Sequence, residues 1–211
     1  MKMPKWFLCL CAAAALAGCG TKTPDLAPLV QIASPSCSAE PDITRSHPLA
    51  LDAENKVEPL RLTIQEQSPC LNEDGAKSLY EVIALPTFSD PLIVTVRSLP
   101  SKSGIFAPRI LMLDKEGNKL RELDREAIHF RGTALTAMLR TRPEERYLVV
   151  ASDTKLVGDD ISRVQGAIHQ QMVSSGVVTF AVYTGSESTA NMTYAHNGTI
   201  QVSARPVPTA E

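Results

Sequence analysis

Short apolar runs with a two-residue period dominate the sequence between Leu49 and Ala204, and they constrain the fold more than any other feature. In the run 92–99, for example, Leu92, Val94 and Val96 fall on one side of an extended chain. Alternation of this kind places one face of a strand on a core and the other toward water. The runs that predict strands are 59–64, 78–85, 92–99, 109–113, 134–139, 147–152, 177–183, 192–195 and 199–204.

Turn residues between these runs predict antiparallel pairing. Gly117, in the loop 114–118, supplies the positive φ that closes a hairpin between 109–113 and a further strand over 119–123. The sequence His196-Asn197-Gly198 predicts the same kind of turn between the last two strands. In the run 109–113 both alternating sets of side chains are apolar, which predicts a strand covered on both faces.

One segment, 160–173, departs from the two-residue period. Ile161, Val164, Ile168 and Met172 recur at spacings of three and four residues, which is typical of one stripe of a helix, and an aspartate precedes them as a cap. A shorter helical turn is a candidate within 122–130. We therefore predict a mainly all-β fold, an antiparallel β-sandwich that is Ig-like or jelly-roll-like, with one short helical insertion.

The N-terminus has the three-part layout of a secretory signal. Lys2 and Lys5 precede an apolar run over 6–16, and small residues follow it. A helix needs about twenty apolar residues to cross a ~30 Å hydrocarbon layer, so a run of about eleven directs export without remaining as a span. We expect residues 1–18 to be a signal peptide.

The end of that segment, Leu16-Ala17-Gly18-Cys19, resembles the lipobox of bacterial lipoproteins. The resemblance implies cleavage before Cys19 and acyl chains such as palmitate on its sulfur, which would hold the protein at a membrane. Gly20 is not the aspartate that resembles an inner-membrane retention signal in enteric bacteria. The expected location is therefore the periplasmic face of the outer membrane. The alternative is an ordinary signal peptide with a chance cysteine.

The chain after the signal divides into a tether and one domain. Residues 19–41 carry Pro24, Pro28, Pro35 and Pro41 among Thr, Ser and Ala. Such a stretch buries too little apolar surface to repay the entropy of ordering it, which predicts a lipidated, flexible tether. The remainder suffices for one core, so we expect a single sandwich domain over 42–206 and a C-terminal tail over 207–211.

The cysteines predict one disulfide. Cys9 and Cys11 leave with the signal and Cys19 carries lipid, which leaves Cys37 and Cys70 as an even pair in an oxidising compartment. A bond between them would remove roughly 3 to 4 kcal/mol of chain entropy from the unfolded state. Two free thiols or a metal site are the competing interpretations.

Charge and motifs limit the functions that the sequence supports. Removal of residues 1–18 takes away two lysines and no acidic residue, so the formal charge moves from −2 to −4. Without a Lys/Arg cluster in the sequence, a nucleic-acid partner is not expected. No GxSxG, HExxH or GxGxxG motif occurs, and the four histidines stand far apart in the sequence, at His47, His129, His169 and His196.

Two weaker patterns have a simple structural explanation. Ser152 and Lys155 fit the SxxK spacing of penicillin-recognising enzymes but stand at the end of a predicted strand, where a turn is expected. Acidic residues interleaved with lysines and arginines could supply a carboxylate pair for glycoside chemistry, but they are typical of a solvated hairpin. We predict no catalytic, metal-binding or cofactor-binding residue. The acidic residues are Asp114, Glu116, Glu122, Asp124 and Glu126.

Three segments resemble the maltose operon periplasmic protein (MalM) family. They are FAPRILMLD at 106–114, RYLVVASD at 146–153 and AHNGTIQV at 195–202. The resemblance implies a periplasmic, β-rich accessory protein without known catalytic residues, and a link to carbohydrate transport.

Three hypotheses for function follow. The first is a non-catalytic accessory, binding or assembly lipoprotein that offers a loop end or sheet edge to an envelope protein or polysaccharide. The second is a hydrolase of envelope glycan or peptidoglycan, which needs two carboxylates ~5 to 9.5 Å apart in a cleft. The third is a transport accessory that binds small sugars in a cleft between loops.

Overall fold

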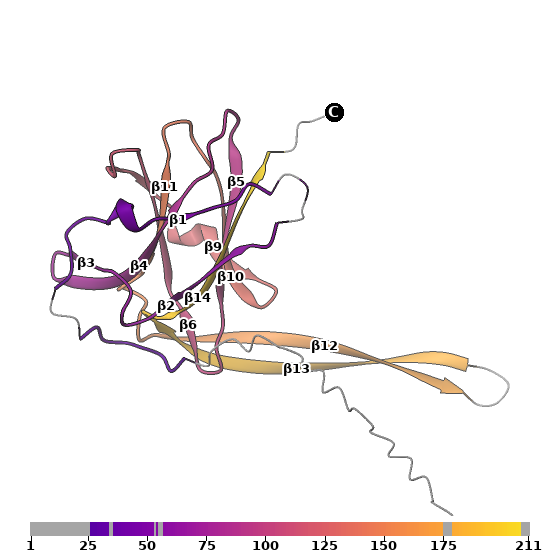
Figure 1. Ribbon diagram of the computed structural model, residues 1–211. Helices are drawn as coiled ribbons and strands as arrows, with labels where there is room; N and C mark the ends of the chain where they lie inside the picture. The colour runs from indigo at the N-terminus through magenta and orange to yellow at the C-terminus, as the bar shows by residue number, and fades with distance from the viewer. Residues whose placement is uncertain (1–25, 34–35, 53, 55–56, 175–178, 208–211) are drawn as a thin grey trace, which may run out of the picture.

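A computed structural model describes residues 26–33, 36–52, 54, 57–174 and 179–207. The expected signal peptide, the expected lipidation site Cys19 and the last four residues lie outside these ranges. Strands make up most of the described chain, arranged as two packed sheets and a smaller third one (Figure 1). The prediction of an all-β sandwich is confirmed.

The first sheet has the strand order β1-β4-β11-β7-β8, and β3 also pairs with β4. Its pairs are antiparallel apart from the short β1, which runs parallel to β4. The strands are β1 (His47–Pro48), β3 (Cys70–Glu73), β4 (Ala76–Ala84), β7 (Pro108–Leu113), β8 (Lys119–Glu122) and β11 (Tyr147–Ser152).

The second sheet has the order β2-β14-β5-β10-β9, with every pair antiparallel. Its apolar side chains face those of the first sheet and form the main core, to which Val94, Ile110 and Leu148 contribute. The strands are β2 (Leu60–Ile64), β5 (Leu92–Leu99), β9 (Ile128–Arg131), β10 (Ala134–Arg140) and β14 (Gly198–Pro206).

The outer face of the first sheet is buried as well. Leu111 and Val149 join a second apolar cluster with Tyr80, against which Ile43 of the short 3-10 helix η1 (Ile43–Arg45) packs. The Tyr80 hydroxyl accepts a hydrogen bond of 3.0 Å from the Asp42 backbone N–H, which holds η1 over the sheet. The prediction that 109–113 is covered on both faces is confirmed.

The third sheet carries the most extended feature of the molecule. β12 (Asp160–Ser174) and β13 (Thr179–Ala195) pair antiparallel along fifteen residues, and β6 (Gly104–Phe106) pairs with β13 only at Thr193–Ala195. Beyond that pairing the two strands leave the sandwich as a long twisted ribbon (Figure 1). We call β12 and β13 together the arm, and the two packed sheets the body.

The predicted helical insertion over 160–173 is wrong, because this segment is strand β12. Gly166 and the β-branched Ile161, Val164 and Ile168 weaken a helix, and β13 offers a backbone ladder along the whole segment. Paired strands therefore prevail over a single helical stripe. Among the described residues, no helix has the length and apolar character needed to cross a membrane.

Two further local predictions differ from the structure. Residues 122–130 contain one short 3-10 turn, η2 (Arg125–Ala127), followed by strand β9. The turn at His196–Asn197 joins β13 to β14 but does not pair them, because β13 belongs to the third sheet and β14 to the second. Gly198 is needed there for space, since a Cβ at this position would lie 2.8 Å from the Phe106 Cβ.

Part of the expected tether contacts the body. The Leu29 N–H donates to Asn197 Oδ1 at 2.8 Å, and the His196 N–H donates to the Leu29 carbonyl at 2.8 Å. Leu29 and Ile32 pack against the main core, which supplies the apolar burial that the composition of 19–41 did not indicate. The segment 26–33 is thus docked at the end of the sandwich that carries β6.

Candidate functional site

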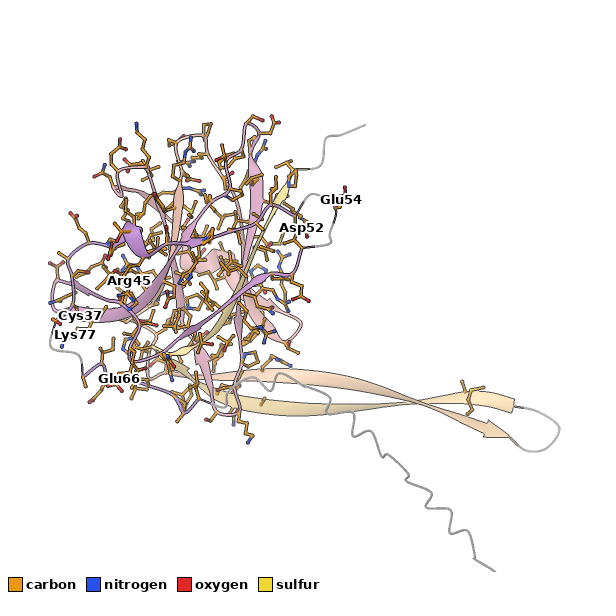
Figure 2. The ribbon with its side chains drawn as sticks, viewed as in Figure 1. Cys37, Arg45, Asp52, Glu54, Glu66 and Lys77 are labelled. Carbon is orange, nitrogen blue, oxygen red and sulfur yellow. A yellow bond between two sulfur atoms is a disulfide. The ribbon has the colours of Figure 1, made fainter. Side chains whose placement is uncertain are left out.

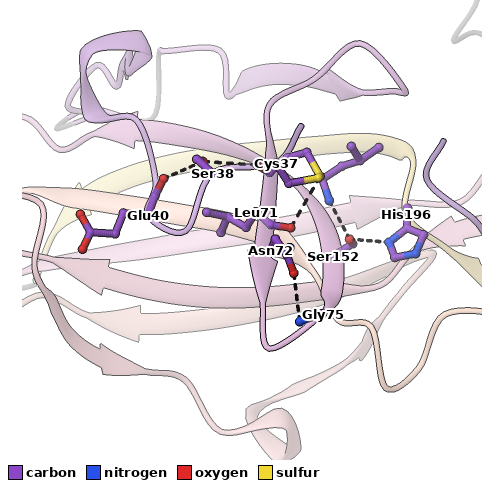
Figure 3. Close-up of a disulfide and its surroundings, with 10 residues drawn as sticks. Cys37, Ser38, Glu40, Leu71, Asn72, Gly75, Ser152 and His196 are labelled. Atoms are coloured by element: carbon purple, nitrogen blue, oxygen red, sulfur yellow. Dashed lines mark hydrogen bonds between the residues drawn. A yellow bond between two sulfur atoms is a disulfide. The ribbon is translucent and has the colours of Figure 1, made fainter. Parts of the chain in front are cut away.

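The predicted disulfide between Cys37 and Cys70 is present, and it joins residues 33 apart in sequence (Figure 3). Backbone hydrogen bonds reinforce it, because Ser38 donates to the Cys70 carbonyl at 2.9 Å and accepts from the Asn72 N–H at 2.8 Å. The bond excludes the free-thiol and metal alternatives for these cysteines. Its role is to tie the segment before η1 to the start of β3.

A serine–histidine pair that no sequence motif indicates lies near the disulfide. Ser152 Oγ and His196 Nδ1 are 2.7 Å apart, and the Leu79 N–H also donates to Ser152 Oγ at 3.1 Å (Figure 3). Ser152 is fully buried and His196 nearly so, and burial lowers the pKa of the imidazole. A nucleophile must reach its substrate, so this sealed pair is a tertiary link between β4, β11 and the turn after β13.

A polar hollow of about 640 Å³ opens where β3 and β11 end and where β4 and β7 begin. The hairpin 109–122 predicted to be solvated supplies part of its wall, through Arg109 and Glu122. Strand pairing explains the convergence, because β7 lies between β8 and β11 and β4 lies beyond β11. Its charged lining residues are Glu73, Asp74, Arg109, Glu122, Arg125, Glu126, Asp153 and Lys155.

Ion pairs occupy the carboxylates of this hollow. Arg109 donates from Nε and Nη2 to the two oxygens of Glu122 at 2.8 and 3.0 Å, and it also pairs with Glu73. Lys119 Nζ lies 2.6 Å from Glu122 Oε2. Mainly through the Arg109 hydrogen bonds, the pKa of Glu122 falls to about 2. The pKa of Arg109 rises, mainly through its hydrogen bond to Glu122.

This arrangement does not favour glycoside hydrolysis. A general acid needs a carboxyl group whose pKa is raised so that it holds a proton near neutral pH. Glu122 is ionised there, and a guanidinium joins it to Glu73. Two more of the lining residues also pair, since Arg125 Nη2 lies 2.7 Å from Asp153 Oδ2. The hollow therefore has the character of a structural ion-pair network.

The other acidic residues singled out in the sequence have local roles. Asp114 accepts hydrogen bonds from the N–H groups of Glu116 and Asn118, at 2.9 and 2.8 Å, and closes the turn at Gly117 as predicted. Those hydrogen bonds, with one from the Asn118 side chain as the largest, lower the pKa of Asp114. Glu116 lies 3.4 Å from Lys115, and Asp124 precedes η2 without a side-chain cap hydrogen bond.

The histidines do not converge. His47 Nε2 lies 3.1 Å from Glu81 Oε2, His129 is exposed on β9, and His196 contacts Ser152. In the part of the chain that the structure describes, no three His, Cys, Asp or Glu side chains are placed to hold a metal ion. The side chain of His169 lies outside the described residues.

The arm is the second candidate site. Its base rests on the body, where Met192 of β13 clusters with Ile105 and Leu135, and Ile161 packs against them. Outside the base, the described sheets give β12 one partner strand, β13, and leave its outer edge without one. Met172, near the end of β12, is 65% exposed. A projecting strand edge of this kind is a template for pairing with another chain.

Comparisons with known proteins yield no relative. No protein-family model, no curated protein and no solved structure matches the chain. The resemblance to the maltose operon periplasmic protein family therefore stays a prediction.

Proposed function

We propose that this protein is a non-catalytic envelope lipoprotein, anchored through Cys19 at the periplasmic face of the outer membrane, whose arm binds an envelope protein or polysaccharide. It is an accessory or assembly module of the cell envelope. The observation that carries the proposal is the arm, a long two-stranded ribbon that leaves the body and exposes an unpaired outer edge.

The sequence of the arm supports a binding role. Natural sheets protect exposed edges with lysine, other charges or proline, which discourage pairing with foreign strands. Between Arg163 and Glu187 there is no Asp, Glu, Lys, Arg or Pro. At ~3.3 Å per residue, each arm strand is ~50 Å long. So long an unprotected edge is a liability unless a partner covers it.

The docked end of the tether supports placement of the arm near a membrane. A Cβ on Gly104 in β6 would lie 2.8 Å from Pro28 Cγ, so residues 26–33 pass directly beside the strand that supports the arm base. Only the residues between Cys19 and Leu26 then separate the lipid from the body. Fully extended, they reach about 25 Å. The arm would therefore work close to the lipid surface.

The anchor is tested by metabolic labelling with palmitate. The full chain is expected to incorporate label and to fractionate with the outer membrane, whereas a Cys19→Ala variant is expected to lose the label. A Cys11→Ala variant is the matched control, because Cys11 would leave with the signal peptide. An unlabelled wild-type chain, or a Cys19→Ala variant that keeps its label, contradicts the anchor.

A replacement of residues 164–186 by a two-residue turn tests the arm separately. The shortened protein is expected to keep its palmitate and its thermal stability, because the arm–body contacts that the described residues show lie outside this range, at Ile161, Arg163 and Met192. It is also expected to lose the envelope partner. Retention of the partner by the shortened protein contradicts the proposed role of the arm and leaves the anchor untouched.

The link to carbohydrate uptake that the resemblance implies is a separate and narrower proposal. A panel of oligosaccharides tested for thermal stabilisation of the purified protein addresses it. A stabilising sugar supports the link, and a flat result at millimolar concentration contradicts it.

A further inference from the structure

The outer face of the second sheet gathers arginines. Strand alternation turns Val96, Ala137 and Val202 into the core, so the residues next to them point to the other side. Five arginines fall on that outer side, one from each strand, although the protein as a whole is acidic. They are Arg61 in β2, Arg97 in β5, Arg131 in β9, Arg140 in β10 and Arg205 in β14.

The strand register brings polar partners beside the central arginine. Gln201 of β14 lies opposite Arg97 on one side and opposite Arg61 on the other. Thr136 of β10 lies opposite Arg97 on its remaining side and opposite His129 of β9. One row across all five strands thus consists of hydrogen-bonding side chains, with Arg97 at its centre.

Three of the arginines line a hollow of about 350 Å³ on this face. Arg97, Arg131 and Arg205 are among its lining residues, and so are the hydroxyl-bearing Thr95, Thr136 and Ser203. The Thr136 hydroxyl already donates to the Ala134 carbonyl at 3.2 Å. Asp52 is the one carboxylate among the lining residues. It accepts a hydrogen bond of 3.2 Å from the Val57 N–H.

The arginines of the hollow differ from those elsewhere in their partners. Arg109, Arg121 and Arg125 each pair with a carboxylate. In contrast, Arg131 donates to His129 Nε2 and Met138 Sδ, both at 3.2 Å, and neither acceptor is a carboxylate. No ion pair joins Arg97, Arg131 or Arg205 to a carboxylate of a described residue.

We propose that this hollow is a binding site for a phosphate group. A phosphate carries one or two negative charges and presents at least two unesterified oxygens, which matches three arginines and the hydroxyl groups of Thr95 and Ser203 better than a single carboxylate does. The site lies on the sheet opposite the ion-pair network and is independent of the arm. The phosphate can belong to a free anion, a phosphorylated sugar or a lipid headgroup.

Equilibrium binding to the full-length protein in detergent tests the site and identifies the source. The probes are inorganic phosphate, mannose 6-phosphate and glycerophosphoglycerol, the water-soluble headgroup of phosphatidylglycerol, with glucose and glycerol as controls that carry no phosphate. At least one phosphate-bearing probe is expected to bind saturably and more weakly as salt rises. The probe that binds identifies the source of the phosphate.

Variants decide whether the binding belongs to this hollow. Arg97→Gln is expected to weaken binding by at least about tenfold, since it removes a charged donor. Arg45→Gln, an exposed arginine in η1 on the other side of the molecule, should leave binding unchanged (Figure 2). If Arg97→Gln does not fold, Arg205→Gln serves in its place, because Arg205 is exposed. Absence of saturable binding by all three phosphate probes, or equal binding by wild type and the hollow variant, overturns the proposal.

Discussion

The body and the arm are both built from antiparallel strands, but they differ in what their strands pack against. In the body, β7 and β11 have a strand on each side and apolar clusters on both faces. The arm packs on the body only at its base and has an edge that no described strand covers. Most of the apolar packing among the described residues therefore lies in the body, and the recognition role proposed above falls to the arm.

The largest expected effect comes from a pair of alanine truncations, one in the body and one on the arm. Phe106 is fully buried in the main core, so Phe106→Ala should lower the free energy of unfolding by about 4 kcal/mol. Met172 lies on the arm strand β12 and is 65% exposed, so Met172→Ala should cost less than about 1 kcal/mol. Denaturant unfolding of both variants measures the contrast. Equal losses would mean that the arm is part of the cooperative core.

The disulfide should have the next largest effect. Replacing both Cys37 and Cys70 by serine releases a loop of 33 residues and should lower the free energy of unfolding by about 3 kcal/mol. The same protein measured with and without a reducing agent gives the comparison within one sequence. A double variant as stable as wild type would show that the body closes without this bond.

The smallest effect concerns the ion-pair network and depends on pH. The pKa of Glu122 falls from 4.5 to about 2 on folding, mainly through Arg109. The contribution of the ionised Glu122 to the free energy of unfolding is therefore complete above pH 4.5 and is lost as the pH falls toward 2. The side chain is partly exposed, so the pair contributes little. Between pH 6 and pH 2, Glu122→Gln should therefore lose only about 1 kcal/mol less unfolding free energy than wild type.

Urea unfolding between pH 6 and pH 2 measures the effect, with Glu66→Gln as the control. Glu66 is exposed in the turn after β2 (Figure 2) and should leave the pH dependence as in wild type. Identical pH profiles for wild type and Glu122→Gln would contradict the assigned role of the Arg109 pair.

Features that depend on neighbouring residues in the sequence could be predicted. The two-residue period located β5, β7 and β11, and the turn chemistry of Asp114 and Gly117 located the hairpin that follows β7. The pair Cys37 and Cys70 followed from the number of cysteines. In each case the determining interaction is local or a matter of counting.

Features that depend on distant pairing could not be predicted. The segment 160–173 shows a helical stripe, and only its ladder with β13 makes it a strand. Leu29 docks because Asn197, far along the chain, accepts its N–H. The contact of Ser152 with His196 and the gathering of arginines around Arg97 arise from sheet order, which no local pattern encodes.

Photo-crosslinking in intact cells tests the central contrast most directly. A photoreactive residue is placed at Met172 on the arm, which is 65% exposed, and for comparison at Leu120 on β8 of the body, which is 39% exposed. A discrete crosslinked product is expected from position 172 and none from position 120. No product from position 172, or the same product from both positions, would show that the arm is not the binding surface.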